Sequence, residues 1–486
     1  MEFTQKQQAF INEFAKEINN GDAAIFAGAG FSASLGFVNW KELLRDLAEE
    51  LELDIDKETD LLSIAQYHFN KFTRSKINTK IINEFTSLSS GSENHKILSR
   101  LGIDTFWTTN YDQLIERTLE AEGKTVEKKI RNSDFSRNIK KRDAIVYKMH
   151  GDKDSPDEAI LTKDDFESYN DKMELFTIAL RGELVSKTFL FLGFSFDDPN
   201  LEYILGRVKI LLKGNTPTHY CFFKEIAESD FNDSSLSAEQ NKENYLYAKI
   251  KQGLKIDNLV RYGIRAIMIN DYSEITLILS EIEKRVKRKN IFLSGAAHDY
   301  SPFSEEDAKD LIHSLSYKLA ENQYKIVSGY GLGIGSIVIN GALDYKLNSN
   351  YRNLDDLLIL RPFPQIQSGS KSISEIWTDY RNEMISKAGI AVFVFGNKLV
   401  NGEIVDSNGM EEEFEICIKH NVIPIPIGTT GSVSKSLWEK VNTELTKYYP
   451  DHAELHNAIK ELGKDNLSKD EIITNTIKAI NILQKI

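Results

Sequence analysis

AAIFAGAGFSASLG, residues 23–36, sets a short apolar run directly before a glycine-rich turn. A continuous apolar run of this length is typical of a strand buried on both faces, as in a parallel sheet covered by helices. Gly28, Ala29 and Gly30 follow where this strand would end, and glycine there lets the backbone approach a ligand closely. The next glycine, Gly36, comes later in the chain than the third glycine of the dinucleotide-binding fingerprint. The loop alone is therefore as typical of a strand-to-helix turn without a ligand as it is of a ligand-binding turn.

Apolar runs of the same kind recur along the chain, with stretches of helical spacing between them. Up to residue 269 they are TFWTTN, AIVYKMHG, TFLFLGFS, HYCFF and IRAIMI. This alternation predicts an α/β fold with a mainly parallel, Rossmann-like sheet. The polar segment 225–250 is typical of a surface insertion. Before the first run, a helix is predicted by four apolar residues that share one face, Phe10, Ile11, Phe14 and Ile18.

The same pattern starts again after the highly charged stretch EIEKRVKRKN, residues 281–290. We place a domain boundary in this stretch and expect two α/β domains, residues 1–285 and 286–486. The later strands are expected at IFLSGAA, KIVSGYGLG, LLILRPFP, IAVFVFGN and VIPIPIG. Between the first two of these runs, a helix is predicted by leucines that stand four residues apart, Leu311, Leu315 and Leu319.

The composition of the 486-residue chain argues against several classes of function. Its 60 Lys and Arg against 73 Asp and Glu give a net charge of -13, which disfavours a nucleic-acid partner, because phosphate backbones are bound by basic surfaces. Cys221 and Cys417 are too few for a disulfide framework or a four-cysteine zinc site, so no metal or other cofactor is expected. No apolar run approaches the roughly 18 residues of a membrane span, and we expect a cytoplasmic protein without a membrane partner.

Polar residues and glycines follow several predicted strands of the first domain, at the carboxyl ends where parallel sheets gather ligands. They are Asn110, Asp112, His150, Gly193, Ser195 and Asn200. Three of them have an ordinary structural alternative: Asn110 suits a helix N-cap, Asp112 the first turn of a helix, and His150 a hydrogen-bonded position at a strand end. Their occurrence in one order along the chain favours a ligand site over these alternatives.

The order GAG-x-S, T-x-N-x-D, HG and G-x-S resembles the NAD-binding domain of the sirtuins over about the first 285 residues. The resemblance implies that Asn110 holds the ribose or positions water, and that His150 acts as a base or contacts the ribose hydroxyls. It also implies that Asp112 recognises the carboxamide of nicotinamide. The other NAD-binding residues that it implies are Ala27, Gly28, Gly30, Phe31, Ser32, Gly193, Ser195 and Asn200.

The chain departs from the sirtuins in two features of the deacylase site. It lacks the cysteines of the zinc module, and FVNW, residues 37–40, stands where many sirtuins carry PDFR. Both departures disfavour an acyl-lysine peptide as the acceptor of ADP-ribose and favour water. The resemblance then implies that NAD+ is the substrate of a hydrolase that releases nicotinamide and ADP-ribose, and not a cofactor.

The second series of strands resembles the SLOG superfamily of Rossmann-like nucleotide sensors, whose relatives include nucleotide phosphoribohydrolases. The enzymes among them carry PGGxGTxxE, and SNGMEEEFEI here keeps only Gly409 and Glu413 of that signature. Arginine and lysine can clamp phosphates while glutamate accepts from ribose hydroxyls, which favours a receptor; solvated helix charges are the alternative. The resemblance implies that a nucleotide signal is bound by Ser294, Gly295, Gly329, Gly331, Arg361, Arg381, Lys398, Gly409 and Glu413.

A sirtuin-like domain followed by a SLOG domain resembles the NAD-consuming effectors of the Thoeris anti-phage defence system over essentially the whole chain. This resemblance implies a TIR-domain partner protein that makes a cyclic ADP-ribose isomer, which binds the second domain and activates NAD+ hydrolysis in the first. It also implies a homo-oligomer, either a tetramer or a larger assembly. Two other hypotheses stay open: a non-catalytic nucleotide sensor that controls a partner, and a zinc-independent deacylase of the sirtuin type.

Overall fold

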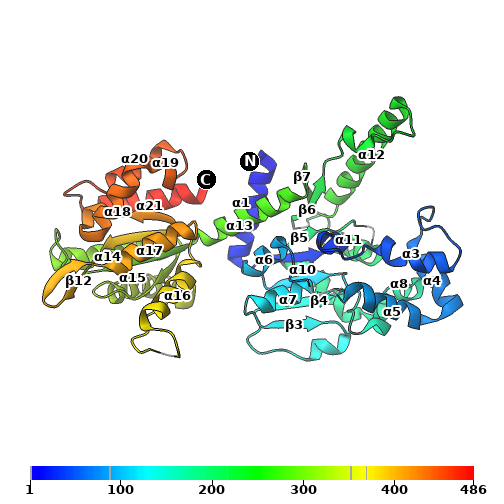
Figure 1. Ribbon diagram of the computed structural model, residues 1–486, viewed down its shortest axis with the longest axis horizontal. Coiled ribbons are helices and arrows are strands. Elements are labelled where there is room, and N and C mark those ends of the chain that lie inside the picture. The colour runs from blue at the N-terminus through cyan, green and yellow to red at the C-terminus, as the bar shows by residue number, and fades with distance from the viewer. Residues whose placement is uncertain are drawn as a thin grey trace. The chain divides into compact units, whose positions relative to one another are not determined.

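The computed structural model of the chain describes residues 3–86, 89–196, 198–215, 217–350, 353–367 and 369–485. The chain folds into two compact units, Met1–Glu283 and Lys284–Ile486. Each unit contains its own parallel sheet with helices packed around it (Figure 1). The predicted α/β class with two mainly parallel sheets is therefore confirmed.

The first unit is built on a seven-stranded sheet with the order β3-β4-β2-β1-β5-β6-β7, in which neighbouring strands are parallel. All six runs expected from the sequence form strands. The edge strand β3 escapes that prediction because its sequence, VEKK, contains no apolar run. The strands are β1 (Ala23–Ala27), β2 (Thr105–Thr108), β3 (Val126–Lys129), β4 (Ala144–Lys148), β5 (Thr188–Leu192), β6 (His219–Lys224) and β7 (Ile264–Ile269).

Helices connect and cover these strands. The first of them, α1 (Gln5–Asn20), begins at a capping box on Thr4 and buries the predicted apolar face of Phe10, Ile11, Phe14 and Ile18. The others are α2 (Ala29–Ser32), α3 (Trp40–Glu50), α4 (Leu61–Phe72), α5 (Arg74–Phe85), α6 (Glu93–Arg100), α7 (Leu114–Ala121), α8 (Lys163–Glu167), α9 (Tyr169–Lys172), α10 (Glu174–Ser186), α11 (Pro199–Leu211), α12 (Ala238–Val260) and α13 (Ser273–Lys287), with 3-10 turns η1 (Ala33–Leu35), η2 (Asn132–Ser136), η3 (Pro156–Glu158) and η4 (Glu228–Phe231).

Strands β1 and β5 lie side by side in the middle of the sheet, and the chain leaves them in opposite directions. After β1 it continues to β2 on one side, and after β5 it continues to β6 on the other. In open parallel sheets, the loops beyond two such strands diverge and leave a crevice for ligands. The loop 28–36 and the loop that begins at Gly193 therefore lie where a ligand site is expected.

Two polar segments of the chain are helical. The charged stretch 281–290 contains the end of α13, whose last turn is basic as suits a helix C-terminus, and β8 begins at Asn290. The polar segment 225–250 contains η4 and more than half of α12. Of the 23 described residues of α12, only Leu259 is buried.

The second unit has a five-stranded parallel sheet with the order β10-β9-β8-β11-β14. Its strands are β8 (Asn290–Ala296), β9 (Lys325–Ser328), β10 (Leu358–Leu360), β11 (Ile390–Phe395) and β14 (Ile423–Pro426), and an antiparallel hairpin is formed by β12 (Asn397–Val400) and β13 (Glu403–Asp406). The five sheet strands match the five expected runs. The hairpin was not expected, because all four residues of β13 are exposed and its sequence lacks a buried apolar pattern.

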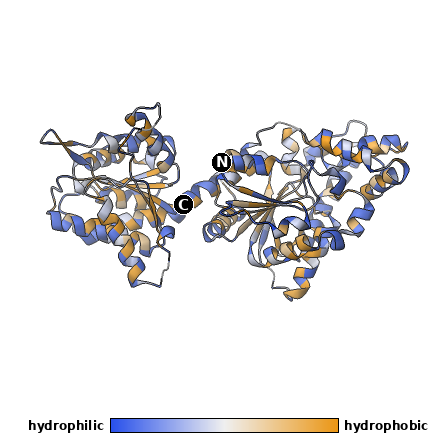
Figure 2. Ribbon diagram, turned by 90° about the horizontal axis from the view of Figure 1, so that it is seen from below, coloured by the Kyte–Doolittle hydropathy of each residue, from blue (hydrophilic) through white to orange (hydrophobic). Residues whose placement is uncertain are grey.

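The helices of the second unit are α14 (Glu305–Glu321), α15 (Gly335–Asn348), α16 (Ile373–Ile385), α17 (Asn408–Lys419), α18 (Ser432–Thr443), α19 (Leu445–Tyr448), α20 (Ala453–Glu461) and α21 (Lys469–Lys485), with 3-10 turns η5 (Leu354–Asp356) and η6 (Gly428–Thr430). The leucines predicted to face the sheet from α14 are buried. In both units apolar residues gather along the strands (Figure 2). Among the described residues, no helix is long and apolar enough to cross a membrane.

Candidate functional site

The glycine-rich loop after β1 packs directly on the loop after β5. The backbone N–H of Gly28 donates to Leu192 O, and that of Gly30 donates to Gly193 O, both at 2.9 Å. Gly193 has φ +61°, and a Cβ there would overlap the Phe31 nitrogen. The glycines thus serve the close contact of two loops, and the amides of Gly28 and Gly30, which we expected to approach a ligand, donate to carbonyl groups in the structure.

We expect Gly193→Ala to destabilise the first unit by about 3 kcal/mol, because the methyl group adds overlap with the loop after β1 to the strain of a positive φ. Gly21→Ala is the matched control: Gly21 has φ +81°, but a Cβ there meets nothing within 4 Å. The control should lose about 1 kcal/mol. Urea unfolding of both variants measures the difference, and equal losses would show that the contact between the loops carries no energy.

Asn110 lies just beyond β2 and is bound to the glycine-rich loop. Its side-chain nitrogen donates to Gly28 O at 3.1 Å and to Ser32 Oγ at 3.2 Å. The N-cap alternative for Asn110 does not hold, because α7 begins at Leu114 with Gln113 in the N-cap position. The side-chain amide instead links two of the loops at the carboxyl edge of the sheet.

Three buried polar atoms around the turn at Phe31 and Ser32 have no hydrogen-bond partner in the structure. They are Asn110 Oδ1, Asp112 Oδ2 and His95 Nε2. The other carboxylate oxygen of Asp112 accepts from Leu114 N at 3.0 Å, so the expected helix-start role occupies one oxygen and leaves the second. Buried polar atoms are nearly always hydrogen-bonded, so these three atoms at the carboxyl edge of the sheet are free to bond a polar ligand.

His95 was not predicted from the sequence. It lies in the first turn of α6, where its Nδ1 is 2.8 Å from Ser92 Oγ and its ring lies 4.1 Å from that of Phe31. Burial lowers the pKa of His95 to about 4, against the opposing charge of Asp112, so the imidazole is neutral at pH 7. A histidine in a capping position gives no signal of its own in the sequence, and its role depends on what lies beside it in the fold.

His150 follows β4 and pairs with a residue that the sequence analysis also missed. Its Nε2 lies 2.9 Å from Asp198 Oδ2, and each side chain is 9% exposed. The ring of His150 meets those of Phe166 and Tyr169 edge-on, at 5.3 and 6.4 Å. His150 is therefore held on one side by a carboxylate and on others by aromatic rings.

The remaining predicted residues of the first unit differ in how closely they join this cluster. Ala27 O accepts from Thr108 Oγ1 at 2.9 Å, which ties β1 to β2 directly below Asn110. Asn200 is buried in the first turn of α11, and its side-chain nitrogen has no partner in the structure. Ser195 is exposed in the loop after β5.

A buried ionic cluster lies under the loop that carries Asn110 and Asp112. Lys148 Nζ is 3.2 Å from Glu116 Oε1 and 2.8 Å from Asp152 Oδ2, and it also donates to the backbone oxygen of Asp112. Burial opposes the charge of Lys148, but these carboxylates outweigh it and raise the pKa of the ammonium group. The cluster fixes the backbone of the loop from below.

In the second unit, a comparable cluster surrounds Arg381 of α16. Its Nη1 is 2.7 Å from Glu412 Oε2, its Nε is 3.4 Å from Glu413 Oε1, and its guanidinium lies 4.9 Å from the centre of the Phe363 ring. Glu413 Oε2 accepts from Ser294 Oγ at 2.6 Å. Burial raises the pKa of Glu413, while Ser294 and Arg381 oppose the shift. Three predicted signal-binding residues, Ser294, Arg381 and Glu413, thus come together.

The other predicted residues of the second unit border this cluster to different degrees. A Cβ on Gly409 would lie 2.7 Å from Arg381 Nη2, and one on Gly329 would lie 2.7 Å from the Phe363 ring. Lys398 bonds to the side chain of Asn408, next to Gly409. A Cβ on Gly331 would overlap Gly295 O, so these glycines let the loop after β9 pack on the end of β8. Arg361 N donates to Ser328 O at the end of β9.

Comparisons with known proteins match different families to the two parts of the chain. Residues 104–247 match the SIR2-like domain, and residues 274–483 match the Sir2- and TIR-associating SLOG family. A protein of Cytobacillus dafuensis named NAD(+) hydrolase ThsA is 46% identical over 98% of this chain and 97% of its own length. The chain belongs to the ThsA family.

Two further ThsA proteins show the same full-length similarity. The ThsA of Bacillus cereus (strain MSX-D12) is 45% identical over 98% of both chains. The ThsA of Acinetobacter baumannii (strain 532279) is 42% identical over 95% of this chain and 96% of its own length. Because the ThsA relatives match along both units, the order of the two domains is a property of the family.

Proposed function

We propose that this chain is an NAD+ hydrolase, as the names of its ThsA relatives state for them, and that the reaction takes place in the unit Met1–Glu283. The observation that carries the proposal is the cluster of unpartnered buried atoms on His95, Asn110 and Asp112, beside the glycine-rich loop at the carboxyl edge of the sheet. A polar ligand there would satisfy these atoms, and NAD+ offers both a carboxamide and ribose hydroxyls to do so.

The chemistry needs few catalytic groups. The bond between ribose C1′ and the pyridinium nitrogen breaks with its electron pair going to nitrogen, so nicotinamide leaves as a neutral molecule and needs no protonation. Water attacks C1′ and gives up one proton, and the products are nicotinamide, ADP-ribose and H+. The site must therefore orient NAD+, stabilise an oxocarbenium-like ribose and remove one proton from water.

Two residues of the cluster, together with His150, can perform these tasks. The carboxamide of nicotinamide would donate to Asp112 Oδ2, which is buried and unpartnered. The side-chain amide of Asn110 would hold the ribose or the attacking water, because its Oδ1 is still open while its nitrogen is fixed to the glycine-rich loop. His150 would accept the proton of the water, a task for which imidazole is suited at neutral pH.

The test is to incubate the purified chain with NAD+, alone and with cyclic ADP-ribose isomers, and to measure free nicotinamide. Release that is equalled by the formation of ADP-ribose supports hydrolysis. A parallel reaction with an acylated peptide separates the deacylase alternative, which would form acyl-ADP-ribose. Absence of nicotinamide under every condition would overturn the proposal.

For the unit Lys284–Ile486, we propose the role of a nucleotide receptor. The buried cluster of Arg381, Glu413 and Ser294 offers a cation for a phosphate and a carboxylate for a ribose hydroxyl, which is what an ADP-ribose-like signal requires. The signal would be a cyclic ADP-ribose isomer made by a TIR-domain protein, and its binding would activate NAD+ hydrolysis. We further propose that the chain acts as a homo-oligomer in the cytoplasm.

A further inference from the structure

Asp198 faces His150 from the start of α11, which lies outside the loops that carry the predicted catalytic residues. Asp198 Oδ2 and His150 Nε2 lie 2.9 Å apart, which is within the distance of an ion pair. Both side chains are almost completely shielded from solvent. A carboxylate in such a place orients an imidazole and determines which of its nitrogens carries the proton.

The carboxylate of Asp198 is itself held in place by the helix. Its Oδ1 accepts from the backbone N–H groups of Asn200 and Leu201, both at 2.9 Å, so Asp198 is the N-cap of α11. Burial opposes its charge, but His150 and these two amides outweigh burial and lower the pKa of Asp198. The second oxygen, Oδ2, is thus presented to His150 as a fixed, ionised acceptor.

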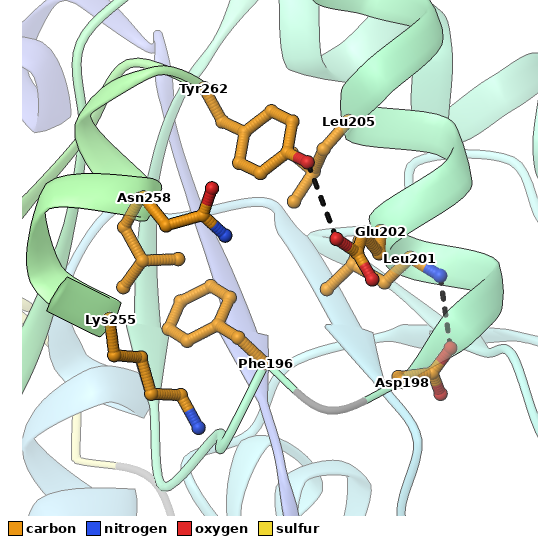
Figure 3. A pocket seen from close by; sticks show the side chains of 9 residues that line it. Phe196, Asp198, Leu201, Glu202, Leu205, Lys255, Asn258 and Tyr262 are labelled. Atoms are coloured by element: carbon orange, nitrogen blue, oxygen red, sulfur yellow. Dashed lines mark hydrogen bonds between the residues drawn. The ribbon is translucent and has the colours of Figure 1, made fainter. Parts of the chain in front are cut away.

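The other polar groups around the pair do not replace this carboxylate. Tyr111 and Tyr169 face it from the β2 and α9 sides, and burial raises the pKa of both phenols, which therefore stay neutral. On the side of α11 and α12, Asp198 borders a small cavity of about 40 Å³ that is also lined by Glu202 and Lys255 (Figure 3).

We propose that Asp198 is a positioning residue of the NAD+ hydrolase site, which accepts the Nε2 proton of His150 and so leaves Nδ1 as the base. This inference rests on the proposed function. In the step concerned, the attacking water forms a bond to ribose C1′ and transfers one proton to Nδ1. The imidazolium that results is stabilised by the adjacent carboxylate until it returns the proton to solvent.

Two substitutions separate this role from helix capping. Asn and Ser cap helices about as well as Asp, so Asp198→Asn and Asp198→Ser should both keep α11. Neither offers a carboxylate, and the amide of Asn would donate to Nε2 and impose the wrong tautomer. We expect kcat for NAD+ hydrolysis to fall about 100-fold in both variants, with KM little changed.

The matched control is Asp60→Asn, since Asp60 is the N-cap of α4 and accepts from Ser63 N in an exposed position. This variant should hydrolyse NAD+ at the rate of the unchanged chain. Melting temperatures of all variants report the effect on capping. If the unchanged chain hydrolyses NAD+ and both Asp198 variants match its kcat, the positioning role is wrong. If the unchanged chain releases no nicotinamide, the proposed function fails instead.

Discussion

Asn110→Ala should lower the rate of nicotinamide release about 1,000-fold or more while leaving the chain folded. The side chain is buried beside the glycine-rich loop, and its Oδ1 is one of the three unpartnered buried atoms around the turn at Phe31 and Ser32. If that oxygen orients the ribose or the water, its loss removes an interaction made in the transition state, which lowers kcat more than substrate affinity. Nicotinamide release at saturating NAD+ measures the effect.

A matched control for this substitution is Asn132→Ala. Asn132 makes the same type of bond, from its side-chain nitrogen to Lys172 O at 2.9 Å, but it lies in η2. It should lose a similar small amount of stability and no activity. If Asn110→Ala releases nicotinamide as fast as the unchanged chain, the proposed site is wrong, whatever happens to the stability of the variant. A thermal shift with NAD+ shows whether the variant still binds the substrate.

The sequence predicts the sheets well because strand burial leaves a direct trace in composition. All eleven expected runs form strands, and each is apolar because helices cover the sheets on both faces. The trace is absent where the residues of a strand are charged or fully exposed. The charged residues of VEKK in β3 and the exposed residues of β13 therefore gave no strand signal.

The site is harder to predict, since its members are defined by side chains that approach each other from distant parts of the chain. Asn110 and His150 carry a signal because they follow strands in a recognisable order. Asp198 stands in the run FDDPN, where composition does not tell which acidic residue caps α11 and meets His150. His95 comes from a helix that precedes β2, and its part in the cluster depends on the stacking of its ring on Phe31.

The glycine-rich loops show a different limit of sequence reasoning. Glycine at 28, 30 and 193 is equally consistent with room for a ligand and with contact between loops. The structure uses these glycines for contact, since the amides of Gly28 and Gly30 donate to the β5 strand end and loop. The second unit uses Gly331 and Gly333 in the same way against the loop after β8. Polar side chains around each loop, and not the glycines, are what point to a ligand.

Arg381→Ala should raise the concentration of cyclic ADP-ribose isomer needed for half-maximal NAD+ hydrolysis about 1,000-fold, if the second unit is the receptor. Arg381 is 9% exposed and pairs with Glu412 and Glu413. Removing it deletes the cation for a phosphate and leaves Glu413 buried without its ionic partner. Truncating one partner of a buried, hydrogen-bonded charge pair between a protein and its ligand costs about 2–5 kcal/mol of binding free energy, and about 4 kcal/mol corresponds to a 1,000-fold change in affinity.

The fold of the variant and the geometry of the arginine can be tested separately. Asp379→Ala is the matched control, because Asp379 lies on the same helix two residues earlier and forms an exposed ion pair with Lys371. It should leave the half-maximal concentration unchanged. Arg381→Lys keeps the charge but loses the planar fork of the guanidinium. If Arg381 holds two acceptor atoms of the ligand at once, NAD+ hydrolysis by this variant should respond only weakly to the isomer. If the isomer stimulates NAD+ hydrolysis by Arg381→Ala fully at the concentration that suffices for the unchanged chain, the receptor lies elsewhere. If the unchanged chain hydrolyses NAD+ and no isomer stimulates it, NAD+ hydrolysis does not depend on such a signal.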